Sequence, residues 1–155
     1  MIYNLLKLVH LLSIIVWIGG MVFAFFFLRP AAQALEAPQR VRLMHDALQR
    51  FFTAVSVAVI AVLVTGLWMI GRVAKQAVQS GGNFDMPLAW TIMAALGIVM
   101  MLIFGHIRFA SFKRLKRAMA ASNWPSAGEA LASIRTGVAV NLALGFAIVA
   151  VTVLM

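Results

Sequence analysis

The sequence predicts an all-α fold, a four-helix transmembrane bundle in which residues 1–155 form a single membrane domain. Of the 155 residues, 64% are hydrophobic and only 11% are charged, whereas about 25% of the residues of a soluble domain carry a charge. Four apolar stretches are also long enough to cross a bilayer, because a spanning helix needs about 20 apolar residues. They are residues 5–28, 51–70, 88–107 and 134–154.

The residues that flank these spans favour membrane helices. The first span is too long for the apolar part of a signal peptide, and Arg29-Pro30 follows it where small residues would mark a cleavage site. Gly, Asn and Pro in QSGGNFDMP punctuate the connection between the second and third spans. Before the fourth span, NWPSAGEA indicates a helix start, with Ser126 and Glu129 at the spacing of a capping box.

The lysines and arginines predict the orientation. The first and third connections are rich in them, whereas the second connection and the N-terminus hold only Arg72, Lys75 and Lys7. Because positive residues stay cytoplasmic, we expect both termini on the periplasmic side of a bacterial inner membrane. On the inner side, VRLMHDALQRFF and HIRFASFKRLKRAM keep an apolar helix face, so the helices should extend beyond the hydrocarbon. The expected partner of these charges is the lipid bilayer and not nucleic acid, because they flank apolar spans and form no groove-reading motif.

Two absences limit the chemistry of the chain. It has no cysteine, which excludes disulfides, thiolate metal sites and thiol nucleophiles. Its four acidic residues all lie outside the spans, which argues against a carrier that moves protons through buried carboxylates. They are Glu36, Asp46, Asp85 and Glu129. The sequence identifies no catalytic residue.

His10 lies within the first span, where an ionisable group is costly and therefore suggests a function. His10, Ser13, Trp17 and Gly20 follow one another at steps of three and four, so they form one stripe on a helix. Gly19 beside the stripe lets a neighbouring backbone come close. We therefore expect the stripe to face the bundle. The alternative is that His10 reaches the outer headgroups and that Trp17 only packs.

His106, near the end of the third span, is a second candidate. At 1.5 Å per residue, His10 lies about 10 Å outward of its helix midpoint and His106 about 12 Å inward of its own. The two helices run in the same direction, so the imidazoles are about 20 Å apart along the membrane normal and cannot ligate the same metal ion. The alternative for His106 is that it ends the helix and contacts the inner headgroups together with Arg108.

Haem is one chemistry that these residues fit. An iron-porphyrin needs one or two axial ligands from His or Met, a slot lined by aromatic residues, and Arg or Lys for its propionates. The candidates are His10, Met69, Met93 and Trp17 for an outer haem, and His106, His45 and Arg108 for an inner one.

Copper is the other chemistry. Imidazole and thioether ligands suit Cu(I), and His10, Met69 and Met93, with Met86 as a further candidate, could form an outward-facing entry site. The alternative is that the 10 methionines fill gaps in the core, since they form no spaced run along one face.

The sequence also resembles a known family. LLKLVHLLSIIVWIGGMVFAFFFLRPA is similar to the opening helix of the bacterial CopD family, in which a His is followed by an apolar stretch and then W-x-G-G. TGLW at 65–68 and the segment that starts with GHIRF resemble short, stand-alone CopD-type proteins. The resemblance implies an integral membrane protein associated with copper uptake or resistance across the inner membrane.

The first helix is also similar to that of HemJ, the membrane protoporphyrinogen oxidase, at the spacing of Lys7, His10, Ser13, Trp17 and Gly20. This resemblance implies b-type haem on His10 and electron delivery to quinone. The third-helix Lys of HemJ has no counterpart here, and TGVAVN replaces its Asn-Glu-x-Pro element. Oxidation of protoporphyrinogen is therefore not implied.

Three functions follow from these observations. The first is a metal-centre protein that binds one or two haem b groups and transfers electrons in the membrane, with a quinone or a redox partner. Such a protein could be a haem-dependent membrane oxidoreductase. The second is a CopD-type permease for copper uptake or resistance. The third is a non-catalytic membrane subunit, which needs no ligand. The sequence leaves the oligomeric state open.

Overall fold

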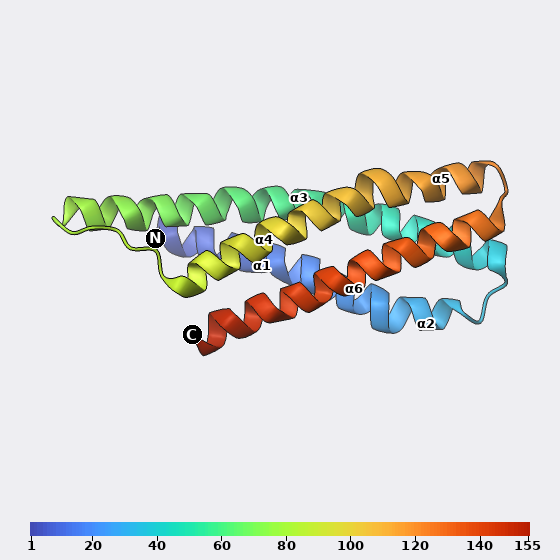
Figure 1. Ribbon diagram of the computed structural model, residues 1–155, viewed down its shortest axis with the longest axis horizontal. Coiled ribbons are helices and arrows are strands. Elements are labelled where there is room, and N and C mark those ends of the chain that lie inside the picture. The colour runs from blue at the N-terminus through green and yellow to red at the C-terminus, as the bar shows by residue number, and fades with distance from the viewer.

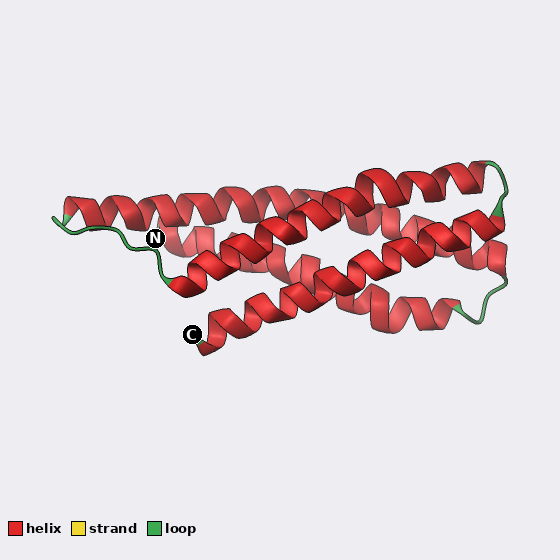
Figure 2. Cartoon of the chain, viewed as in Figure 1, coloured by secondary structure: helices red, strands yellow, loops and turns green.

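The computed structural model describes residues 1–155 as helices joined by short connections (Figures 1 and 2). Four continuous helical rods are each long and apolar enough to cross a membrane, which confirms the predicted four-helix transmembrane bundle. They are Ile2–Ala32, Ala37–Gln79, Leu88–Ala120 and Trp124–Leu154. Each rod contains one of the four predicted spans, and the chain has no strand (Figure 2).

The first and third rods each widen into a π-helix partway along. The first rod consists of α1 (Ile2–Val22), the π-helix η1 (Phe23–Leu28) and α2 (Arg29–Ala32). The third consists of α4 (Leu88–His106), the π-helix η2 (Ile107–Ser111) and α5 (Phe112–Ala120). The second and fourth rods are α3 (Ala37–Gln79) and α6 (Trp124–Leu154).

Pro30 gives a physical reason for η1. A proline inside a helix has no N–H to donate, and its ring crowds the carbonyl one turn before it. The backbone relieves this crowding by widening, and the N–H of Arg29 bonds to the carbonyl of Ala24, five residues back. The wider turn rotates the helix face that follows, which determines where Arg29 points.

Both chain termini lie at one end of the bundle, and the α2–α3 and α5–α6 connections lie at the other (Figure 1). We call the first the terminal end and the second, which comprises residues 29–50 and 108–135, the basic end. α3 has 43 residues and is therefore about 64 Å long, roughly twice the thickness of the hydrocarbon. At the basic end Val41, Met44 and Leu48 are buried along one face, which confirms the predicted extension of this helix.

The bundle consists of two helix pairs that meet at a cluster of aromatic rings. α1 packs mainly on α3, and α4 and α5 pack mainly on α6. Phe104 of α4 joins the pairs, because its ring meets the edges of Trp17 at 6.1 Å and Phe52 at 5.8 Å. Phe52 also meets Phe112 at 5.2 Å. Edge-to-face pairs of this kind each contribute about 0.5–1.5 kcal/mol beyond the burial of their area.

α6 begins as predicted, but its cap is a different residue. The side-chain oxygen of Asn123 accepts a hydrogen bond from the backbone N–H of Ser126 at 3.1 Å. The predicted capping box with Ser126 as its first residue is therefore wrong. The reason is Pro125, which fits the first turn of a helix because it has no N–H to leave unsatisfied. The helix consequently starts before Pro125, and Ser126 lies inside its first turn.

Gly20 allows the first testable prediction. A Cβ atom at Gly20 would collide with the ring of Phe51, whereas a Cβ at Gly19 would meet nothing within 4 Å. Gly20→Ala should therefore lower the free energy of unfolding by about 1–3 kcal/mol, the usual cost of overpacking. Gly19→Ala is the matched control, because it adds the same methyl group to the same helix. Thermal unfolding in detergent measures both, and equal melting temperatures for the two variants would contradict the close packing of α1 on α3.

Candidate functional site

His10 is buried between α1 and α3, near the terminal end. Its side chain is 8% exposed, and its Nδ1 atom lies 2.9 Å from the hydroxyl oxygen of Thr65 on α3. This confirms that the stripe on the first helix faces the bundle. The alternative, in which the imidazole reaches the headgroups, does not describe this ring.

The hydrogen bonds of Thr65 favour a proton on Nδ1 of His10. The Thr65 hydroxyl has a single hydrogen, which it donates to the carbonyl of Ala61 at 2.5 Å or to that of Val62 at 3.3 Å. When this hydrogen is donated within α3, the oxygen accepts a hydrogen bond from Nδ1–H of His10, which is the tautomer that we assign. This assignment follows from the hydrogen-bond network. It leaves Nε2 with a free lone pair, as in imidazoles that bind metal ions while their other nitrogen donates to a protein oxygen.

Gly66 gives the imidazole its place beside the α3 backbone. A Cβ atom at this position would lie 3.3 Å from Cε1 of His10, closer than side chains normally approach. Thr65 and Gly66 therefore act as a pair, in which one residue holds the ring and the other makes room for it. Trp68 in the same TGLW sequence is 55% exposed and faces outward, so it does not line this site.

Two other members of the stripe have separate roles. Trp17 is buried at 4% exposure and packs on Phe104. It lies seven residues from His10, about 10 Å along the helix, and its contacts are those of a core residue. The hydroxyl of Ser13 donates to the carbonyl of Val9 at 2.8 Å, within the same helix.

The two predicted methionine ligands lie on different helices. Met69 is half-buried on α3, one turn beyond Thr65 toward the terminal end. Met93 is half-buried on α4, where its sulfur lies 4.0 Å from the hydroxyl oxygen of Thr152 on α6, whose hydrogen is donated to the carbonyl of Ile148 at 2.8 Å. Met69 therefore lies on the same helix as the partner of His10, whereas Met93 belongs to the α4–α6 interface.

The predicted inner residues are only partly brought together. His45 stacks on Phe112 with ring centroids 5.3 Å apart, and its Nδ1 lies 2.9 Å from Asp46 Oδ1. The guanidinium of Arg108 lies over the same Phe112 ring at 5.6 Å. His106 is exposed on the outside of α4, and no hydrogen bond or ring contact joins it to His45. The structure also has no group of three or more His, Cys, Asp or Glu side chains that could hold a metal ion.

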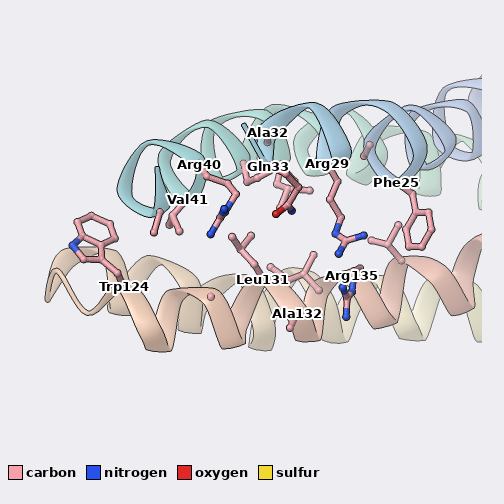
Figure 3. Close-up of a pocket in the computed structure, with 17 residues that line it drawn as sticks. Phe25, Arg29, Ala32, Gln33, Arg40, Val41, Trp124, Leu131, Ala132 and Arg135 are labelled. Carbon is pink, nitrogen blue, oxygen red and sulfur yellow. The ribbon is translucent and has the colours of Figure 1, made fainter. Parts of the chain in front are cut away.

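Two features of the interior were missed by the sequence analysis. Asn141 of α6 is 1% exposed; its amide donates to the carbonyl of Met100 at 3.1 Å, and its Oδ1 has no partner. A cavity at the basic end is lined by Arg29, Arg40 and Arg135 among other residues (Figure 3). Both features had a signal in the sequence, because Asn141 and the arginines are polar residues within or next to apolar runs. The residues that they meet on other helices cannot be derived from the sequence of one helix.

Comparison with known proteins connects this architecture to a family. The family model described as Copper resistance protein D, CopD, matches residues 45–155, more than two thirds of the chain. No curated protein and no solved structure matches the chain. The matched range includes Thr65 and Gly66, whereas His10 and the part that resembles HemJ lie before it. The four membrane-spanning rods and this match together show that the chain is a multi-pass membrane protein of the CopD family.

Proposed function

We propose that the protein handles copper in the bacterial inner membrane and that Nε2 of His10 is a ligand for Cu(I). The observation that carries the proposal is the hydrogen bond between His10 and Thr65, which leaves the lone pair of Nε2 available to a metal ion. A buried imidazole in hydrocarbon is costly, and coordination of a metal ion would offset that cost. The family description, copper resistance, agrees with this chemistry.

The charge of the surroundings favours a monovalent ion. All four carboxylates lie outside the predicted spans, and the chain has no cysteine. A metal ion bound here would keep its full charge, and the cost of a charge in a medium of low dielectric rises with the square of that charge. Cu(I) therefore costs less than a divalent ion. It also accepts neutral, soft ligands such as imidazole and thioether.

Met69 is the proposed second ligand. It lies one turn beyond Thr65 on α3, toward the terminal end, and methionine side chains are flexible enough to turn toward an ion. The positive-inside distribution predicts that the terminal end faces the periplasm. In this arrangement His10 and Met69 would receive copper from the periplasmic side. Met93 lies on α4 against Thr152 of α6 and not on the helix that holds Thr65, so it is not included in this site.

Haem b stays the second candidate, because a free Nε2 is also what an axial ligand of haem iron provides. Space favours copper. The His10 ring packs closely on α3 at Gly66, and a porphyrin bound through Nε2 would need a broad planar slot beside this helix. A single ion needs no such slot. Electron transfer with a quinone or a redox partner would follow only from the haem assignment.

The first test is Cu(I) binding by the full-length protein in detergent, measured by competition with a chromophoric Cu(I) chelator under reducing, oxygen-free conditions. We expect the wild type to bind copper and His10→Gln to lose it, because the substitution removes the imidazole lone pair. His106→Gln is the matched control on the exposed face of α4 and should bind as the wild type does. Binding that survives in His10→Gln would overturn the assignment. A Soret band that disappears in His10→Gln would establish haem instead.

The second test concerns Thr65. Thr65→Val keeps the shape of the side chain but removes the oxygen that accepts from Nδ1–H, so the ring loses its orientation. We expect the Cu(I) affinity to fall about 10–100-fold, the usual effect of losing such a supporting hydrogen bond. Thr65→Ser restores the hydroxyl and should recover most of the affinity. Equal affinities for the Val and Ser variants would mean that Thr65 does not position His10.

A further inference from the structure

A second site lies at the basic end, far from His10. A cavity of about 220 Å³ opens between α2 and the start of α3 on one side and α6 on the other (Figure 3). Twelve of its 17 lining residues are hydrophobic. The cavity therefore has largely apolar walls, into which a few strongly polar groups project.

Those polar groups are mainly three arginines from three different helices. Arg29 comes from α2, Arg40 from α3 and Arg135 from α6. In Figure 3 the side chains of Arg29 and Arg40 run from their helices toward α6, and the Arg135 guanidinium lies opposite Arg29. Arg29 and Arg40 are half-buried, whereas Arg135 is exposed at the edge of the cavity.

No carboxylate neutralises this cluster. The chain has a formal net charge of +9, and its one ion pair joins His45 to Asp46. Three like charges that converge on one cavity repel each other, and the repulsion grows where the surroundings exclude water. An anion bound between them would replace that repulsion with attraction. The cavity thus has the electrostatic character of an anion site.

Its depth matches the level of the lipid headgroups. Arg135 precedes Leu154, the end of α6, by 19 residues, about 28 Å of helix and close to the thickness of the hydrocarbon core. Toward the terminal end the cavity reaches Phe25 and Val138, which are apolar. The arginines therefore lie at the membrane boundary, and part of the apolar wall, including Phe25 and Val138, lies on their hydrocarbon side.

We propose that this cavity binds an anionic phospholipid, with its phosphate held by Arg29, Arg40 and Arg135 and an acyl chain along the apolar wall. The planar guanidinium group can donate two parallel hydrogen bonds to a phosphate. Basic pockets between membrane helices suit the headgroups of acidic lipids. The lipid connects α2 and α3 to α6 and so holds the two helix pairs together at the basic end. This inference does not depend on the assignment of copper.

The test is native mass spectrometry of the full-length protein in non-ionic detergent, with phosphatidylglycerol or phosphatidylcholine added. We expect the wild type to retain phosphatidylglycerol in preference to phosphatidylcholine. Arg29→Gln/Arg135→Gln should lower this retention about tenfold or more, since two of the three cations are lost. Lys113→Gln/Arg114→Gln is the matched control, because it removes the same charge from exposed positions on α5 outside the cavity. It should retain the lipid.

Three results would overturn the proposal. They are an equal loss of lipid in both double variants, equal retention of the two lipids by the wild type, and displacement of phosphatidylglycerol by millimolar inorganic phosphate, which would identify a site for free phosphate. Circular dichroism checks the fold of each variant. If Arg29→Gln/Arg135→Gln does not fold, the single variant Arg40→Gln replaces it. We expect this variant to retain less phosphatidylglycerol than the wild type, by a smaller factor than the double variant. Unchanged retention would contradict the proposal.

Discussion

The hydrogen bond between His10 and Thr65 is the constraint on which the proposed function depends. In hydrocarbon no water is available to satisfy an imidazole or a hydroxyl, so each must find its partner within the protein. In the assigned tautomer, the Thr65 hydroxyl satisfies both groups, because it donates to the carbonyl of Ala61 and accepts from Nδ1–H of His10. The bond links α1 to α3 and orients the ring, and with the proton on Nδ1 it leaves Nε2 free. The remaining nitrogen, Nε2, is the one proposed to bind the metal ion.

The two ends of the bundle differ in what they can bind. Near the terminal end the interior offers neutral donors, an imidazole nitrogen and a thioether, which suit a soft metal ion of low charge. At the basic end it offers guanidinium groups, which suit an anion. His10 and Arg29 lie on the same rod, 19 residues and about 28 Å apart, and the ring cluster around Phe104 lies between the two levels. This separation lets one small bundle hold a cation and an anion without direct competition.

The sequence was sufficient for the features that depend on one helix at a time. The apolar runs predicted all four rods, and the three-and-four spacing from His10 to Gly20 predicted a face toward the bundle, which the burial of His10 and Trp17 confirms. Features that depend on the register between helices were out of reach. Nothing in the α1 sequence selects Thr65 as the partner of His10. The π-helix η1 rotates Arg29 about the helix axis, and the regular 3.6-residue spacing of an α-helix does not predict this rotation. The convergence of Arg29 with Arg135 could therefore not be predicted.

The central claim is that His10 keeps its proton on Nδ1 and presents a bare Nε2. Solid-state ¹⁵N NMR of histidine-labelled protein in lipid bilayers tests it directly, with His10→Gln used to assign the signals. The account predicts that Nδ1 of His10 is protonated before and after Cu(I) is added and that only the Nε2 resonance shifts with the metal. A proton on Nε2 in the metal-free protein, or a His10 Nε2 resonance that does not shift when Cu(I) is added, would contradict this account.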